Sequence, residues 1–186
     1  MVHFLSRRQN WAKASPLFGI ASAVWLCMTF HPSQAIFWAL VNIPLFLFHQ
    51  TEEHLWPGGF KDYMNRVLYQ LPAGEERLTD VRIFWINIMF VWFPFLIFGI
   101  LSAYNLGFGL LIIIFSIMNA STHIEEAIRR KRWNPGLGMA SVQMLASIYA
   151  AYFISTYGLA DKAFWWAGAI LFSAIVHIIL YRFVMR

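Results

Sequence analysis

The chain has 186 residues, of which 60% are hydrophobic and 12% are charged. A soluble domain carries about 45–50% apolar and about 25% charged residues, so this composition excludes a soluble globular protein and indicates an integral membrane protein. The formal net charge of +5 is then a signal of membrane topology, and we expect no nucleic-acid partner.

Six segments of about 20 mostly apolar residues, the length that spans a bilayer, follow one another along the chain. They are residues 15–31, 34–54, 81–103, 107–128, 137–157 and 163–183. The sequence therefore predicts an all-α, polytopic membrane helix bundle with about six transmembrane helices in a single domain, residues 1–186. Pro44 and Pro94 fall inside two of these segments, which membrane helices tolerate better than soluble ones.

The basic residues predict the orientation, because cytoplasmic loops carry an excess of lysine and arginine. If the N-terminus is cytoplasmic, every lysine and arginine except Lys162 falls on the cytoplasmic side. We therefore expect both termini and the longest loop, residues 55–80, in the cytoplasm. Residues 60–71 of that loop, FKDYMNRVLYQL, are predicted either as an amphipathic helix on the inner leaflet or as an ordinary folded loop.

Polar side chains from five of the six segments reach one layer near the cytoplasmic face in this topology. They are His49, Glu52, Glu53, Asn87, Asn119, His123, Glu126, Gln143 and His177. Carboxylates inside a membrane are costly unless they are paired, protonated or metal-bound. We therefore expect a functional site in this layer, with a structural network of ion pairs as the alternative.

A histidine and a glutamate three residues apart share a helix face, and this spacing occurs at His49/Glu52 and at His123/Glu126. Two-metal helix bundles use the related Glu-x-x-His spacing, so the pattern predicts a centre for one or two divalent transition-metal ions. The predicted ligands are His49, Glu52, Glu53, His123, Glu126 and His177. Cys27 is the one cysteine in the sequence, and a centre without thiolate ligands fits zinc, iron or manganese.

Glu53 and Glu126 are predicted to be the catalytic residues. Each carboxylate of the layer, Glu52 included, can serve as a metal ligand or as a general base. His177 taken alone is explained equally well as a hydrogen-bonding strut between helices. The HExxH spacing of zinc proteases does not occur in the sequence.

The stretch HQTEEHLWPGGF, residues 49–60, resembles the HXXEE-motif family of bacterial membrane proteins. That family combines His-x-x-Glu-Glu with a further histidine and an aromatic-x-Pro-Gly motif. The matching positions are His49, Glu52 and Glu53, then His123, then Trp133–Gly136 (WNPG). The resemblance covers about residues 40–140 and implies an enzyme in the inner membrane of a bacterium.

The run EEAIRR also resembles the Glu-Glu-x-x-x-Arg motif of CAAX-type intramembrane proteases, through Glu125, Glu126 and Arg130. Those proteases need two further histidine motifs on later helices. His177 is the one histidine downstream, so we set this resemblance aside.

These observations together predict a metal-dependent membrane enzyme, either a hydrolase or an oxygen-activating enzyme. Its substrate is expected to be lipid-like or soluble in the membrane and to bind near the cytoplasmic leaflet. The alternative is a proton- or cation-binding transporter, or a non-catalytic membrane module, that uses the same polar layer. A transporter needs polar residues on both sides of the layer, whereas the outer halves of the helices are almost wholly apolar.

Overall fold

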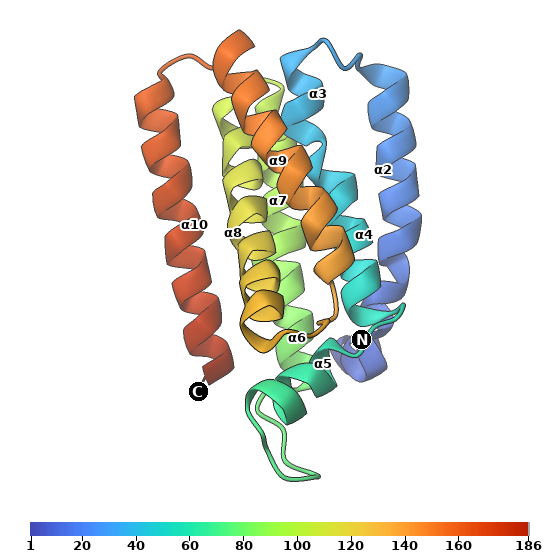
Figure 1. Cartoon of the computed structure of the whole chain (residues 1–186). Coiled ribbons are helices and arrows are strands. Elements are labelled where there is room, and N and C mark those ends of the chain that lie inside the picture. Colours follow the sequence, from blue (N-terminus) through green and yellow to red (C-terminus); the bar gives the residue numbers. More distant parts are fainter. Residues whose placement is uncertain (186) are drawn as a thin grey trace.

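The computed structural model describes residues 1–185, and every regular element in that range is a helix. The elements are α1 (Val2–Ser6), η1 (Arg7–Ala14), α2 (Ser15–Thr29), α3 (Ala35–Leu40), α4 (Asn42–His54), α5 (Phe60–Asp62), η2 (Tyr63–Leu68), α6 (Asp80–Asn87), η3 (Ile88–Trp92), α7 (Phe93–Ser102), α8 (Gly107–Arg130), α9 (Leu137–Tyr157) and α10 (Lys162–Met185). The long helices run side by side in one bundle (Figure 1). The predicted all-α helix bundle is confirmed.

Five segments of the described chain are long and apolar enough to cross a membrane. They are Val2–Thr29, Asp80–Ser102, Gly107–Arg130, Leu137–Tyr157 and Lys162–Arg182. The predicted segment 137–157 coincides with α9, and α8 continues two residues beyond the predicted end at residue 128. By length and composition, these helices are those expected of a membrane protein.

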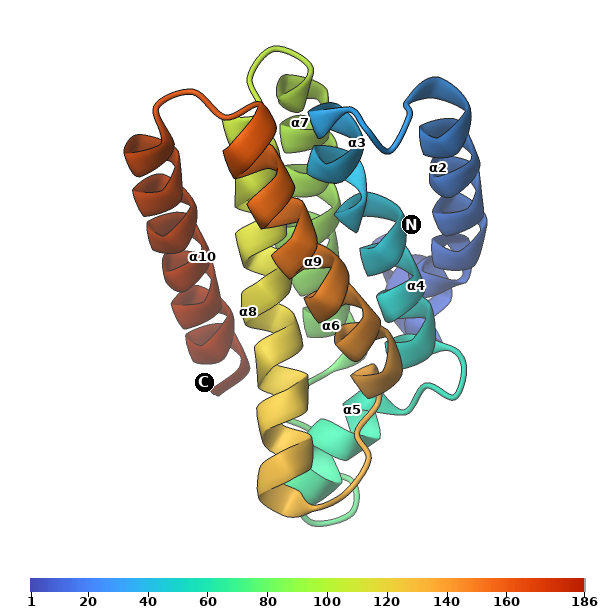
Figure 2. The same ribbon diagram turned by 45° about the horizontal axis from the view of Figure 1, so that its top comes forward.

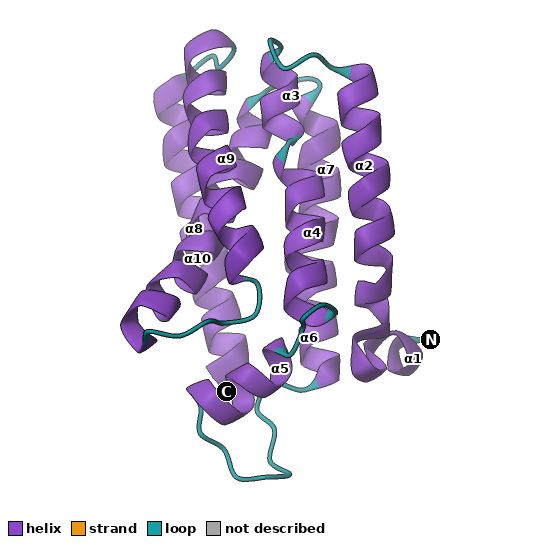
Figure 3. Ribbon diagram, turned by 45° about the vertical axis from the view of Figure 1, so that its right-hand side comes forward, coloured by secondary structure: helices purple, strands orange, loops and turns teal. Residues whose placement is uncertain are grey.

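The predicted helix over residues 34–54 is interrupted, so the expectation of one continuous helix is wrong. α3 ends at Leu40 and α4 begins at Asn42. Pro44 has no N–H to donate to the carbonyl of Leu40, and its ring crowds that carbonyl, which explains a break at this point. The two short helices still follow one another along the height of the bundle (Figure 3).

The second proline inside a predicted span is accommodated differently. In the span that starts at Asp80, the turn before Pro94 is a π-helical segment, η3. A widened turn of this kind relieves the clash between a proline ring and the preceding turn. The segments α6, η3 and α7 therefore succeed one another without a break, as the predicted segment 81–103 requires.

α8 lies between α9 and α10 (Figure 2) and packs against α9, α10, α7 and α3. A Cβ atom at Gly109 would lie 2.5 Å from Cβ of Ala39, so glycine is needed for α3 and α8 to approach this closely. Buried apolar side chains surround this contact and form what we call the apolar core cluster. Its members include Ala39, Leu110, Ile113, Ala150, Ala151 and Ile154.

One end of the bundle holds the N-terminus, the loop between α4 and α6, and the C-terminal end of α10 (Figures 1 and 3). We call this the loop end. The helix considered for residues 60–71 is shorter in the structure, because α5 and η2 end at Leu68. Asn65 ties the loop together: its Nδ2 donates to the carbonyl of Leu78, and its Oδ1 accepts from two backbone N–H groups.

Candidate metal centre

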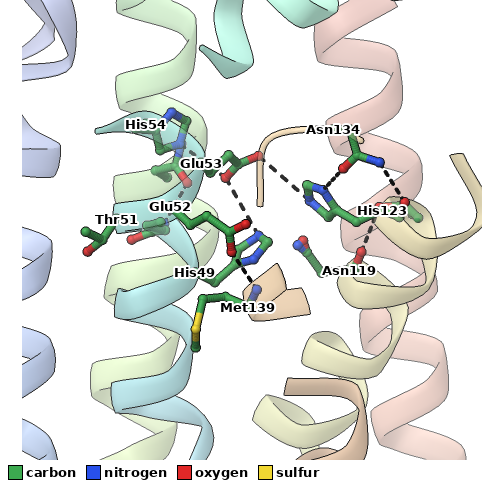
Figure 4. Close-up of polar contacts among 12 residues, drawn as sticks. His49, Thr51, Glu52, Glu53, His54, Asn119, His123, Asn134 and Met139 are labelled. Carbon is green, nitrogen blue, oxygen red and sulfur yellow. Dashed lines mark hydrogen bonds and ion pairs between the residues drawn. The ribbon is translucent and has the colours of Figure 1, made fainter. Parts of the chain in front are cut away.

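α4 presents His49 and Glu53 on one face, because residues four apart are neighbours on a helix surface. Nε2 of His49 lies 3.8 Å from Oε2 of Glu53 (Figure 4). His49 is completely buried, and Glu53 is 7% exposed. Neither ring nitrogen of His49 has a hydrogen-bond partner among the residues described. A buried polar group without a partner is costly, so this geometry is typical of a ligand-binding group rather than of a structural strut.

α8 contributes His123, whose Nε2 lies 3.8 Å from the other carboxylate oxygen of Glu53. The amide of Asn134 orients this ring. Its Nδ2 donates to the backbone carbonyl of His123 over 2.8 Å, which turns its Oδ1 to Nδ1 of His123 at 2.9 Å (Figure 4). An amide oxygen only accepts, so Nδ1 carries the proton. The lone pair is then on Nε2, the atom that faces Glu53.

One ligand atom from each of His49, Glu53 and His123 lies within 4.8 Å of the other two. We call these three residues the histidine–carboxylate cluster. With metal–ligand bonds of about 2.1 Å, two ligand atoms of a tetrahedral ion are about 3.4 Å apart. Each histidine lies 3.8 Å from its own oxygen of Glu53, so a small movement of the side chains brings them to this spacing. Two histidines and one carboxylate are the donor set of many catalytic zinc and non-haem iron sites. The residues present therefore fit a divalent transition metal.

Gly136, between α8 and α9, brings the backbone against the cluster. A Cβ atom at this position would lie 2.8 Å from Cε1 of His49 and 3.1 Å from Cε1 of His123. The φ angle of Gly136 is also +93°, in the left-handed region that favours glycine. The motif Trp133–Gly136 thus supplies both Asn134, which orients His123, and a residue small enough to contact both imidazoles.

His54 is a neighbour of Glu53 that the sequence analysis missed. Its Nε2 lies 3.3 Å from Oε2 of Glu53, and its side chain is 1% exposed. The ring of Trp11 packs edge-on against it, with centroids 5.1 Å apart. Consecutive helix residues point about 100° apart, so adjacency in sequence does not predict this contact. The one feature of the sequence that pointed to this contact was the presence of a histidine directly after the Glu-Glu pair.

Glu52 turns away from the cluster and caps α9. Its carboxylate accepts hydrogen bonds from the backbone N–H groups of Gly138, at 2.9 Å, and Met139, at 2.5 Å (Figure 4). These are among the first N–H groups of the helix, which lack partners inside it and favour a negative charge. The structure therefore does not bring Glu52 together with the other predicted ligands, and gives it a positioning role for the turn that carries Gly136.

The change Glu52→Gln is expected to destabilise the protein by about 1 kcal/mol, because a neutral amide replaces a charged cap at a helix N-terminus. Thermal unfolding in detergent with a chelator present measures this without a contribution from bound metal. Glu125→Gln is the matched control, since Glu125 is exposed in the same layer. Equal melting temperatures for the two variants would contradict the capping role.

Glu126 and His177 also lie outside the cluster. The carboxylate of Glu126 accepts hydrogen bonds from Arg129 and Arg130, which are three and four residues further along α8. Nδ1 of His177 donates to the carbonyl of Ser173 over 2.8 Å, so the ring is anchored to its own helix. Both side chains nevertheless line the cavity next to the cluster.

This cavity has a volume of about 350 Å³ and is formed by α4, α6, η3, α8, α10 and the loop-end elements α5 and η2. Its polar lining includes Glu53, His123, His177, Asn87 and Asn119. Its apolar lining includes Phe46, Phe60, Met64, Val91, Phe115 and Leu180. Glu53 and His123 of the cluster thus face a largely apolar chamber, whereas His49 is not part of its lining. Gln143, the remaining polar residue of the predicted layer, is buried on α9 and is not part of this lining.

The sequence matches, over residues 38–151, the family described as "Protein of unknown function with HXXEE motif". No curated protein and no solved structure matches the chain. The match covers more than half of the chain and includes His49, Glu53, His123 and the motif Trp133–Gly136, whereas His177 lies outside it.

Proposed function

The chain belongs to the HXXEE-motif family, and from that premise we propose that it is a membrane-embedded metalloenzyme whose metal is held by His49, Glu53 and His123. The proposal rests on His49, which is completely buried, faces the carboxylate of Glu53 and has no hydrogen-bond partner within the described chain. A network of ion pairs would join His49 to Glu53 only across 3.8 Å, longer than a hydrogen bond. A metal ion would satisfy all three side chains at once.

The cluster suits one ion rather than two, because Glu52, Glu126 and His177 have other partners. Zinc, iron and manganese all accept two histidines and a carboxylate. When bound, such an ion supplies Lewis-acid activation of water for hydrolysis or, if it is iron, activation of dioxygen. Asn134 holds the ligand nitrogen of His123 in place. Glu53 would bind the ion through one carboxylate oxygen, and the other oxygen could accept a proton.

The substrate that this cavity suits is lipid-like or otherwise soluble in the membrane. Aromatic and aliphatic side chains form most of its wall, while Tyr63, Glu126 and Arg129 add polar groups from the loop end. An amphipathic molecule would place its apolar part against Phe115 and Leu180 and its polar part beside Glu53. In this arrangement Glu126 contacts the polar part of the substrate, which is its proposed catalytic role.

An enzyme is better supported than a transporter. A transporter needs a polar route through both halves of the bundle. The half beyond Asn42 is filled by the apolar core cluster, whose members are less than 7% exposed. The cavity and the histidine–carboxylate cluster both lie toward the loop end, so the site is accessible from one side.

We further propose six membrane crossings, with α3 and α4 together forming the one that the proline interrupts. An even number of crossings puts both ends of the chain on one side, in agreement with the position of the N-terminus and the end of α10 at the loop end (Figure 1). Lys162 is the first residue of α10, at the end of the bundle away from the loop end, and the other lysines and arginines of the described residues lie toward the loop end. Because cytoplasmic loops carry an excess of positive charge, we propose that the loop end lies in the cytoplasm of a bacterium and the bundle in its inner membrane.

This topology predicts that a membrane-impermeant thiol reagent added from outside labels Asp161→Cys and spares Asp62→Cys. Both changes are made in a Cys27→Ser background, because Cys27 is exposed. Asp161 lies between α9 and α10, and Asp62 belongs to α5 at the loop end. Strong labelling of Asp62→Cys in intact cells would reverse the proposed orientation.

The proposed reaction is tested by loading the purified protein with zinc, iron(II) or manganese(II) in vesicles of bacterial lipid. Mass spectrometry of the lipids is expected to show a product that has gained the elements of water, or oxygen in the case of iron. The same preparation of Glu53→Gln should give none. Stoichiometric binding of all three metals without any new lipid product would overturn the assignment as an enzyme on membrane lipids.

A further inference from the structure

The two histidines of the cluster differ in their outer partners. A metal-binding histidine usually donates its second N–H to a carboxylate, a carbonyl or a water molecule. His123 has Asn134 for this purpose. Neither nitrogen of His49 forms a hydrogen bond of normal geometry within residues 1–185, and the backbone group closest to its ring belongs to Gly136. Its Nε2 is directed to Glu53, so its Nδ1 needs a partner on the other side of the ring.

Three chain segments meet at the cluster, through His49, His123 and Gly136. Each segment has a polar residue seven positions away from that residue, on the side away from the loop end. The pairs are Asn42 with His49, Ser116 with His123, and Gln143 with Gly136. Seven residues are nearly two helical turns, about 10.5 Å along the axis, so each polar residue lies on nearly the same face as its counterpart at the cluster. All three are completely buried.

These buried residues lie where the helices meet. The hydroxyl of Ser147 on α9 donates to Oδ1 of Asn42 on α4 over 2.9 Å. Nδ2 of Asn42, Oγ of Ser116 and both amide atoms of Gln143 have no hydrogen-bond partner in the part of the chain described. Since nearly all buried polar groups in proteins are paired, four such atoms on the helices that meet at the cluster indicate a bound ligand.

We propose that these groups bind a short file of water molecules that starts at Nδ1 of His49 and ends at Asn42 and Ser147. The unpaired atoms include both donors, the two amide NH₂ groups, and acceptors, the amide oxygen of Gln143 and the hydroxyl of Ser116. Water satisfies both kinds, and a buried water molecule typically makes about three hydrogen bonds. A cation would be repelled by the NH₂ groups, and an anion by the oxygens.

The file is closed at its far end by the apolar core cluster, in which Ile113, Ala150 and Ile154 are fully buried. It is therefore a blind pocket and not a path across the membrane. Its first water holds the ring of His49 as Asn134 holds that of His123. This role at His49 rests on the proposed function, whereas the water site itself does not.

The direct test is an experimental density map of the chelator-treated protein at a resolution that shows ordered water. Peaks are expected within hydrogen-bonding distance of Nδ1 of His49, the amide of Gln143 and Nδ2 of Asn42. Direct protein contacts to these atoms, with no peak between them, would overturn the proposal. Because the protein is free of metal, failure of the metal proposal would not change this result.

Thermal unfolding gives an independent test, because the proposal predicts whether replacing Gln143 raises or lowers the melting temperature. Gln143→Leu is expected to lower the melting temperature by about 2–4 °C, since it removes an amide that water satisfies. The reference is Gln50→Leu: Gln50 is equally buried but is bonded to Asn87 and Trp92, so its loss must destabilise. A rise in melting temperature for Gln143→Leu would mean that its amide is dry and unpaired, and would overturn the file. If Gln143→Leu does not fold, Ser116→Ala supplies the same comparison of sign.

Discussion

Replacing His49 by alanine is expected to abolish metal binding and leave the helix bundle folded. His49 supplies one of three ligand atoms that lie within 4.8 Å of one another. Loss of an outer-shell partner already weakens metal binding by about 10–100-fold, and loss of a ligand should cost more. The measurement is elemental analysis of protein purified in detergent, with helix content followed by circular dichroism. The wild type is expected to hold about one ion per chain.

The matched control for this experiment is His177→Ala. His177 lines the same cavity as the cluster, but its Nδ1 is engaged with the carbonyl of Ser173. We therefore expect His177→Ala to keep the metal content of the wild type. Equal losses in both variants would show that His177 is a ligand after all, and unchanged metal in His49→Ala would remove the proposed centre.

The change Gly136→Ala is expected to disrupt the centre without touching a ligand. The added Cβ would lie 2.8 Å from Cε1 of His49 and 3.1 Å from Cε1 of His123, so both rings must move. The residue would also keep a φ of +93°, a strain of about 1–3 kcal/mol for a residue other than glycine. We expect loss of the metal together with a lower melting temperature in the presence of a chelator.

Gly74→Ala separates the two causes. Gly74 has a φ of +90°, but a Cβ atom there would meet nothing within 4 Å. It should therefore show a loss of stability from backbone strain alone and keep its metal. If Gly136→Ala retained full metal occupancy, the close approach of this backbone to the two histidines would have no functional consequence.

The helical class and most of the spans could be predicted because they depend on local properties of the chain. A run of about 20 apolar residues must satisfy its backbone hydrogen bonds internally wherever it lies in the membrane, and residues 137–157 form α9 as predicted. The face shared by His49 and Glu53 is likewise a property of one helix. The interruption at Val41 could not be predicted in this way. Pro94 follows a π-helical turn and leaves its helix unbroken, whereas Pro44 follows a break.

The family could also be recognised from the sequence, but the roles of its two glutamates could not. Glu52 and Glu53 are adjacent on α4, and the sequence analysis treats both as ligands. In the structure Glu53 lies between His49 and His123, whereas Glu52 caps α9. Their side chains leave the helix about 100° apart, so different neighbours meet them.

The height of each polar side chain along the bundle could be predicted from the sequence, because height follows from position along a helix of known start. Which of those side chains meet could not be predicted, because that depends on the rotation of each helix about its axis in the folded bundle. Packing sets this rotation through contacts between distant residues, such as Gly109 against Ala39 and Gly136 against the two imidazoles. Glu126 and His177 reach the predicted layer but have rotated to other partners, which no pattern within one helix could have shown.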